Sequence, residues 1–314
     1  MASIQAGRPG GGFESQLGEL VPDGTPAPRP KRIYRSWAPT MVRAVAIVRG
    51  MGTAMTLRQL FYRLVAEQLT RNVQGDYCAL SKQYRDALLD DDTVPELIDR
   101  GREITRYSMW KSPADALRDA ADCYRIDRTV GQPWSIYLVV EKGGSVTQLA
   151  AWFADLGIPI VALKGYASKS FCDAVRRDVL AGPERPSLLL YVGDYDGSGD
   201  DLERSFLERT ACWAVTNRVT LTEDQIYAWD LPIGEGKDKD PRAKKWAARN
   251  GGKNIQVEVD AVDPPMLRAL IQHEIDQVWD VSAFDRALAR EARERSVVRS
   301  IVEPITAYDI GGEA

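Results

Sequence analysis

The chain has 314 residues, enough for one large or two modest domains with buried cores. Its formal net charge is -4, so the overall composition does not indicate a nucleic-acid-binding protein. The charge is unevenly distributed, because residues 31–130 carry 17 Lys and Arg against 13 acids, whereas residues 131–314 carry 22 against 29. The first part is therefore suited to contact phosphates and the second to bind cations.

Residue usage argues against several classes of protein. No apolar run approaches 18 residues and no signal peptide is recognisable, so we expect a soluble, cytoplasmic protein with no membrane contact. The four cysteines show no CxxC spacing, which argues against both a zinc site and a disulfide framework. His273 is the single histidine and is expected on a helix, so no histidine-based catalytic triad is indicated.

The first third of the chain predicts a tail followed by helices. Residues 1–32 are rich in Gly and Pro and predict a disordered tail. Helical periodicity follows over 37–48, over 57–69 with Thr56 as N-cap, and over 77–89. Three short helices with a basic excess favour a helix-turn-helix or winged-helix module, while a helical cap or oligomerisation domain fits the pattern equally well. A connecting helix over 110–128 completes this domain, which we place at 33–130.

Residues 131–300 alternate between strands and helices. This alternation predicts an α/β fold with a mostly parallel, Rossmann-like sheet. Strands are expected at 135–140, 159–163, 188–192 and 226–231, helices at 146–155, 169–180, 200–212, 264–279 and 282–298, a basic loop at 234–253, and a loose C-terminal tail at 301–314.

Acidic residues follow two of these strands. Asp194 and Asp196 come just after the apolar strand 188–192, and Glu141 comes just after strand 135–140. Ligand sites of open α/β sheets lie at the carboxyl ends of the strands, so the three carboxylates are expected to meet there. Hard oxygen donors suit magnesium, and the sequence therefore predicts a magnesium site at Glu141, Asp194 and Asp196.

Less specific interpretations of the acids remain open. The Asp and Gly residues after strand 188–192 are also compatible with a solvated turn. Asp200 and Asp201 are expected to cap the next helix. Glu258 and Asp260 alternate on an expected strand and form a further acidic pair, which we leave outside the site.

Four short motifs resemble a known family. VVEK at 139–142, Lys-Gly at 164–165 and DYDGSG at 194–199 resemble the Toprim domain of topoisomerases, bacterial-type primases and some nucleases. TLRQLFY at 56–62 resembles the Arg-x-x-aromatic-Tyr motif in the winged-helix domain of the topoisomerase VI A subunit and the meiotic double-strand-break transesterase. The order, winged helix and then Toprim domain, is that of this family.

The resemblance covers residues 35–280 and is greatest to the compact Mini-A homologues of bacteria, phages and plasmids. It departs from the family at Gly197, where DxDP is usual, and at Phe61, where Tyr is more frequent. It implies a type IIB topoisomerase-like, DNA-cleaving isomerase that acts on double-stranded DNA as a homodimer, in the cytoplasm and at the nucleoid. No ATPase region is recognisable, so any ATP-driven step would require a separate B-type partner.

The resemblance also implies roles for individual residues. Tyr62 would be the nucleophile that becomes linked to DNA, and Arg58 would stabilise the transition state. Glu141, Asp194 and Asp196 would hold Mg²⁺, with Glu141 also passing a proton to the leaving 3′ oxygen. Without the resemblance, an Arg and a Tyr four apart are common on helices, and Tyr62 would be taken for a packed aromatic residue.

Three further points are left open by the sequence. Lys142 and Lys164 either contact DNA phosphate or only neutralise the acidic pocket. The basic segment 237–253 is either a solvated surface or a DNA clamp. Two other functions compete with the transesterase, namely a Toprim nuclease that uses water and a non-catalytic DNA-binding or recruitment protein of a mobile element.

Overall fold

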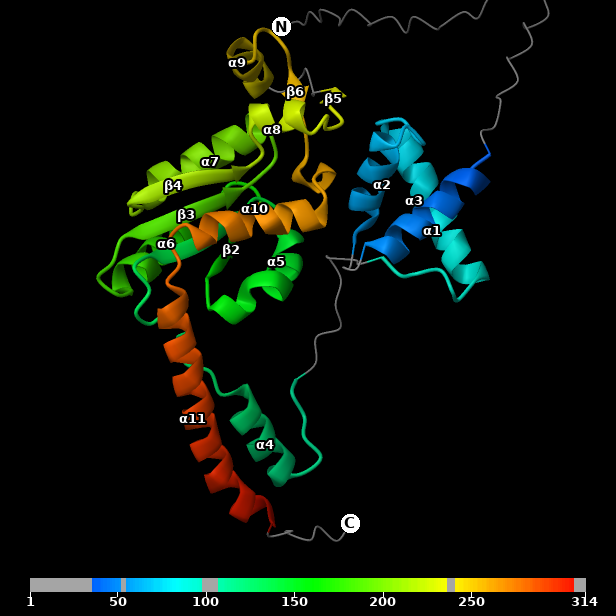
Figure 1. Cartoon of the computed structure of the whole chain (residues 1–314). Coiled ribbons are helices and arrows are strands. Elements are labelled where there is room, and N and C mark those ends of the chain that lie inside the picture. Colours follow the sequence, from blue (N-terminus) through cyan, green and yellow to red (C-terminus); the bar gives the residue numbers. More distant parts are fainter. Residues whose placement is uncertain (1–35, 52–54, 98–106, 236–240, 308–314) are drawn as a thin grey trace, which may run out of the picture. The chain divides into compact units, whose positions relative to one another are not determined.

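The computed structural model describes residues 36–51, 55–97, 107–235 and 241–307 (Figure 1). The chain divides into two units, Met1–Trp37 and Ala38–Ala314, and the second contains almost all of the described residues. The tail predicted at 1–32 lies outside the described residues. Among those that are described, no helix is both long enough and apolar enough to cross a membrane.

Three helices precede the sheet in the chain. They are α1 (Ala38–Gly50), α2 (Leu57–Ala66) and α3 (Gln74–Asp90). Helix α2 begins where predicted because Thr56 and Gln59 form a reciprocal capping box. Leu60 and Leu64 share one fully buried face of α2, which packs against both α1 and α3. The described residues before 98 contain no strand, so the helix-turn-helix or winged-helix interpretation rests on the helices alone.

A parallel sheet forms the centre of the following region. Within the described residues its strand order is β2-β1-β3-β4. The strands are β1 (Ser135–Val140), β2 (Ile160–Ala162), β3 (Ser187–Val192) and β4 (Val215–Thr220), and every pairing is parallel. Nearly all residues of β1 and β3 are buried, as expected for central strands covered on both faces. The predicted α/β class and parallel sheet are confirmed.

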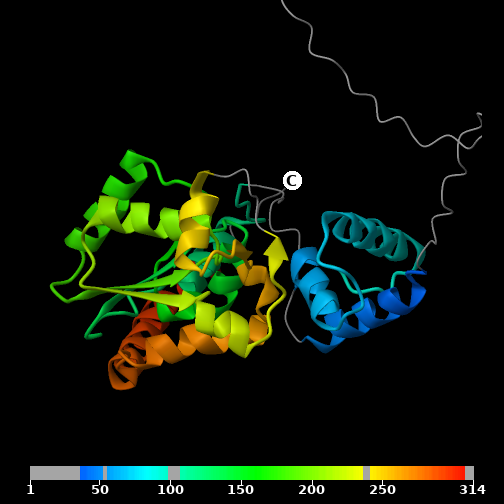
Figure 2. The same ribbon diagram turned by 90° about the horizontal axis from the view of Figure 1, so that it is seen from above.

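Helices cover both faces of this sheet (Figure 2). They are α5 (Ser145–Phe153), α6 (Lys169–Ala181), α7 (Gly197–Thr210) and α10 (Pro264–Asp276). Leu188 and Leu190 of β3 pack with residues of α5 and α10, whereas Leu189 and Tyr191 pack with residues of α6 and α7. The alternation of side chains along one strand therefore supplies two separate cores.

The prediction of a strand at 226–231 is wrong. Helix α8 (Glu223–Ala228) occupies the first half of that stretch, because Thr222 and Gln225 form a second capping box that starts a helix. The fourth strand of the sheet is instead β4, which pairs with β3 on the side away from β1 and was not predicted from the sequence. It is an edge strand whose first two residues are exposed, so it carries polar residues and lacks the apolar run that marks a buried strand.

The chain after α8 also differs from prediction. The expected loop 234–253 contains β5 (Gly234–Glu235) and helix α9 (Pro241–Arg249), and β5 pairs antiparallel with β6 (Ile255–Gln256). A 3₁₀ helix, η2 (Val259–Ala261), follows where an extended strand was expected, and another, η1 (Ala154–Leu156), follows α5.

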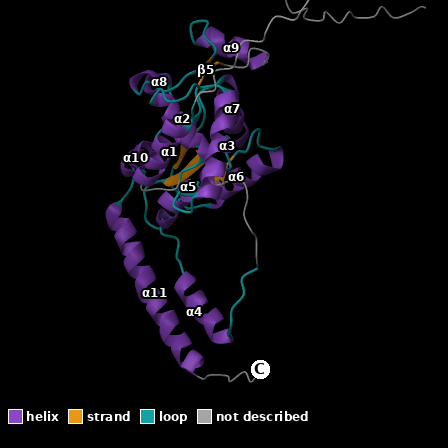
Figure 3. Ribbon diagram, turned by 90° about the vertical axis from the view of Figure 1, so that its right-hand side faces the viewer, coloured by secondary structure: helices purple, strands orange, loops and turns teal. Residues whose placement is uncertain are grey.

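The last helix is longer than predicted. Helix α11 (Val281–Ala307) continues through 301–307, so the expected loose tail is wrong over these residues, and 308–314 lie outside the described part. Helix α4 (Pro113–Cys123) is shorter than predicted, since Ser112 caps its start and Tyr124 ends it. Helices α4 and α11 lie side by side, as two views show (Figure 1, Figure 3).

Candidate active site

Helix α2 presents Arg58 and Tyr62 on one face, since they are four residues apart. Both side chains line a small cleft together with Tyr77 of α3 and Glu258, which follows β6. The Arg58 guanidinium donates a hydrogen bond to Glu258 Oε2 and lies 5.6 Å from the centroid of the Tyr77 ring. The structure thus places the predicted nucleophile and its arginine beside a carboxylate 200 residues further along the chain.

The two central strands bring Glu141 and Asp194 together. Val140 and Val192 are partners in the β1–β3 register, so the residues that follow them leave the same edge of the sheet. The Asp194 backbone N–H donates to Glu141 Oε2 at 3.1 Å. Gly199 leaves room for this approach, because a Cβ there would lie 3.0 Å from Glu141 Oε2 and 2.5 Å from the Asp194 carbonyl oxygen.

Burial and mutual repulsion make this carboxylate pair hard to ionise. Burial, followed by the charge of Asp194, raises the pKa of Glu141 from 4.5 to about 7. Asp194 is only 7% exposed, and burial raises its pKa as well, although Lys142 opposes that shift. The pair therefore holds a proton more readily than two separate, exposed carboxylates would, even with Lys142 beside it.

Asp196 has a different environment. It is the N-cap of α7, and its Oδ1 accepts hydrogen bonds from the backbone N–H groups of Ser198 (2.9 Å) and Gly199 (2.7 Å). Its other oxygen, Oδ2, accepts from Gln256 Nε2 at 2.7 Å. The expectation that Asp200 and Asp201 cap this helix is wrong, because the helix already begins at Gly197.

Lys142 joins the carboxylates into one cluster. Its Nζ lies 2.9 Å from Asp194 Oδ2, 3.0 Å from Glu258 Oε2 and 3.3 Å from Asp260 Oδ2. These contacts are the ones expected if Lys142 neutralises the acidic pocket, and contact of Lys142 with DNA phosphate stays a prediction. Glu258 and Asp260 were left outside the predicted site, although their alternating spacing was visible. The missing information was the contact of this segment with α2 and Lys142, which only the fold creates.

The cluster also determines the protonation state of the tyrosine. Burial and the negative charge of Glu258 raise the pKa of Tyr62, while Arg58 and Lys142 oppose this shift. Burial alone would raise the pKa of Glu258, but Lys142 and Arg58 outweigh it and lower the pKa. In this arrangement Tyr62 is a neutral phenol and Glu258 is an ionised partner of both cations.

Lys164 and Arg218 each donate a hydrogen bond to the backbone just after the central strands β1 and β3. Lys164 has a positive φ of 52° and an exposed side chain, and its backbone N–H donates to the Glu141 carbonyl oxygen at 2.9 Å. Arg218 comes from β4, the strand that sequence reasoning missed, and its Nη2 donates to the Asp194 carbonyl oxygen at 2.6 Å. The loop carrying Asp194 is thus held from the neighbouring strand.

The donor set can be tested for its fit to a metal ion. Within the described residues, no group of three acidic, histidine or cysteine side chains is arranged to hold a metal. Glu141 and Asp194 nevertheless fit a hard divalent cation, because they are adjacent carboxylates with raised pKa values, of which Asp194 is buried and Glu141 half-buried. Lys142 would have to leave Asp194, and Asp196 could join through Oδ2 by giving up its hydrogen bond from Gln256, while Oδ1 continues to cap α7.

Comparison with known proteins adds no relative: no family model matches the chain, and no curated protein matches it.

Proposed function

We propose that this chain is a magnesium-dependent, DNA-cleaving transesterase of the topoisomerase VI A-subunit type, with a winged-helix-like domain before a Toprim domain. Double-stranded DNA is the substrate, and Tyr62 becomes covalently linked to it. The observation that carries the proposal is the contact of the Arg58–Tyr62 face of α2 with the acidic cluster around Lys142, through Glu258. A tyrosine, an arginine and a carboxylate pair from distant segments meet at one place.

Each side chain has a defined part in the proposed reaction. The Tyr62 oxygen attacks phosphorus, a phosphotyrosyl bond forms and the bond to the 3′ oxygen breaks. The phenol proton passes to solvent, and Glu141, whose pKa of about 7 keeps it partly protonated, supplies a proton to the leaving oxygen. Arg58 stabilises the charge that develops on the phosphate. Once Glu141 has given up this proton, it and Asp194 would hold a magnesium ion, which would add positive charge at the same phosphate.

One observation also favours a second candidate, a Toprim nuclease that uses water. A carboxyl group with a pKa of about 7 is suited to act as a general base on water, and Glu141 meets this condition without help from the tyrosine. The neutral, half-buried Tyr62 would then be a packing residue.

Tyr62→Phe separates the two candidates. The variant keeps the ring but has no oxygen to attack phosphorus, so we expect protein-linked DNA ends to disappear. The assay incubates supercoiled DNA with protein and magnesium, stops the reaction with denaturant, and compares samples with and without protease. Asp194→Ala should abolish cleavage in either mechanism.

Tyr77→Phe is the matched control. Tyr77 lines the same cleft and its ring contacts Phe61, but it is not on the Arg58–Tyr62 face of α2. This variant should form adducts as the wild type does. Cleavage at the wild-type rate by Tyr62→Phe, together with loss of cleavage in Asp194→Ala, would replace the transesterase by the nuclease.

A further inference from the structure

Helix α9 and the turn after it form the most basic part of the region around the acidic cluster. Residues 241–253 contain five Lys and Arg and no acidic residue, in a chain whose net charge is -4. Lys244, Lys245, Arg249 and Lys253 are all exposed. Lys245 and Arg249 are four residues apart on the helix, a spacing at which like charges repel and weaken it.

An aromatic anchor holds this helix despite the repulsion. Trp246 is buried, and its indole Nε1 donates to the Ile255 carbonyl oxygen at 2.7 Å. Its ring meets the edge of Tyr195, with 4.6 Å between the ring centroids. The Tyr195 hydroxyl donates to Asn250 Oδ1 at 2.8 Å, at the end of the helix. The contacts fix α9 while its charged residues stay in solvent.

Tyr195, on which Trp246 packs, belongs to the candidate active site. Tyr195 lies between Asp194 and Asp196 in the chain, so the helix is attached to the loop that carries two of the predicted metal ligands. Gln256 of β6 binds Asp196, and Arg249 forms an ion pair with Asp200 at 2.7 Å. The position of α9 is thus set by the acidic loop itself.

The positive charges of α9 are largely uncompensated. Within the described residues, no carboxylate forms an ion pair with Lys244, Lys245 or Lys253. A cleft of about 540 Å³ separates α9 from the start of α7, and Lys245 and Arg249 line it. Flexible lysine side chains act as point charges that attract phosphate without reading bases.

We propose that α9 is a binding site for the phosphate backbone of duplex DNA, with Lys244, Lys245 and Lys253 as the contacting residues. This deepens the proposed function and rests on it, since DNA held by α9 lies next to the loop of Asp194. The site acts on affinity and is independent of base sequence. Its lysines take no part in the chemistry at Tyr62.

The test replaces Lys244 and Lys245 together by alanine. Binding of a short fluorescein-labelled duplex is followed by anisotropy over a range of salt concentrations. We expect the Kd of the variant to rise roughly tenfold and the slope of log K against log salt to fall by about 1.8, the value for two lost phosphate contacts. The control replaces Arg286 and Arg293, two exposed basic residues of α11, by alanine and should bind as the wild type does.

The outcomes separate this inference from the proposed function. An unchanged Kd and salt slope in the Lys244 and Lys245 variant, with DNA-binding wild type, overturns the α9 site alone. Loss of binding to the same extent in the α11 control also overturns it, because the effect is then one of net charge. If the wild type binds DNA, the Lys244 and Lys245 variant binds it more weakly and the wild type still forms no tyrosyl adduct, the transesterase is overturned and the α9 site is supported. Far-UV circular dichroism and the urea unfolding midpoint check that each variant remains folded.

Discussion

Glu141 and Asp194 oppose folding when both are ionised, because burial and repulsion disfavour their charges. The pKa of Glu141 is raised from 4.5 to about 7, so in that pH interval the folded chain binds a proton that the unfolded chain has released. Stability must therefore fall as the pH rises from 4.5 through 7. Asp194 contributes in the same direction, since its pKa is raised too.

Glu141→Gln should remove much of this pH dependence. We expect the wild type to lose about 1–3 kcal/mol of unfolding free energy from this group between pH 4.5 and 8, after allowing for its partial exposure, and the variant to keep that stability. Urea unfolding at a series of pH values measures the effect. Glu208→Gln, an exposed carboxylate of α7, is the control and should follow the wild-type profile. Identical profiles for Glu141→Gln and wild type would contradict the raised pKa.

The effect of magnesium on the unfolding midpoint tests the carboxylate pair Glu141 and Asp194 independently. Metal binding requires ionised carboxylates, so added magnesium should raise the unfolding midpoint more at pH 8 than at pH 6. Asp194→Ala should lose this gain.

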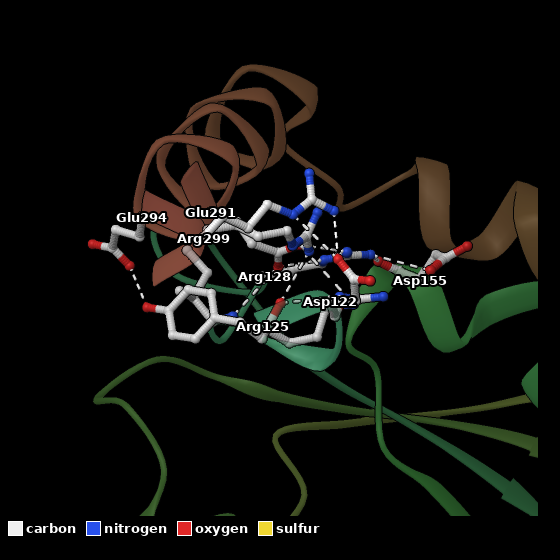
Figure 4. A network of polar contacts seen from close by, with 10 residues as sticks. Asp122, Arg125, Arg128, Asp155, Glu291, Glu294 and Arg299 are labelled. Atoms are coloured by element: carbon white, nitrogen blue, oxygen red, sulfur yellow. Dashed lines mark hydrogen bonds and ion pairs between the residues drawn. The ribbon is translucent and has the colours of Figure 1, made fainter. Parts of the chain in front are cut away.

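Helix α11 is tied to the segment before β1 by an ionic network (Figure 4). Glu291 is 2% exposed and accepts two hydrogen bonds from Arg128, from Nε at 2.9 Å and from Nη2 at 2.7 Å. Arg295 and the backbone N–H of Ile126 also donate to it. The hydrogen bond from Arg128 is the largest cause that lowers the pKa of Glu291 to about 2.

Glu291→Gln should destabilise the fold by about 3 kcal/mol at pH 7, since it leaves partly buried Arg295 without a counter-charge and Arg128 with only the exposed Asp155. Because the pKa of Glu291 is lowered, its contribution exists above pH 4.5 and is lost as the pH falls toward 2, so the difference between variant and wild type should shrink in acid. Urea unfolding at pH 7 and at pH 3 measures both values.

Glu294→Gln is the control on the same helix. Glu294 is more exposed and pairs with Arg290 and Tyr124, so its neutralisation should leave stability nearly unchanged. If Glu291→Gln and Glu294→Gln lose the same unfolding free energy, the buried network stabilises the fold no more than an exposed ion pair does.

The contacts between α2 and the acidic cluster all lie within one chain. Arg58 pairs with Glu258, and Arg63 pairs with Asp263. The resemblance, in contrast, implies a homodimer in which the tyrosine of one subunit acts with the metal of the other. The same-chain and cross-subunit arrangements give opposite results when two defective proteins are mixed.

Mixing Tyr62→Phe with Asp194→Ala protein under conditions of subunit exchange should restore tyrosyl-linked DNA if the site is shared between subunits. About half of the dimers would then be mixed, each with one competent site that nicks one strand. Absence of restored adducts, with mixed dimers demonstrated by differently tagged subunits, would instead assign the reaction to a single chain. A monomer by light scattering, free and with DNA, would exclude the shared site.

Much of this molecule could be predicted from local pattern. The buried strands β1 and β3 are continuous apolar runs, and the Thr56 capping box marks the start of α2, so both were located closely. The carboxylates at the ends of those strands were expected together because parallel neighbours end at the same edge, and Glu141 and Asp194 do meet there. Each strand, cap and acid is encoded in a short stretch of sequence, and the general rule for parallel sheets then places the two strand ends together.

Other features were decided by contacts between distant segments. Strand β4 has no strong local signal, because it lies at the edge of the sheet and carries polar residues. Helix α9 was mistaken for a loop because the surrounding segment is rich in Gly, Lys and Asp, and the packing of Trp246 on Tyr195 exists only in the folded chain. Glu258 joins the site only because the fold brings it to Arg58 and Lys142. The amino-acid sequence thus specified the strands and their terminal acids, whose burial is encoded in short apolar runs. Tertiary structure alone decided the charge partners, because an ion pair forms between side chains that folding brings within a few ångströms.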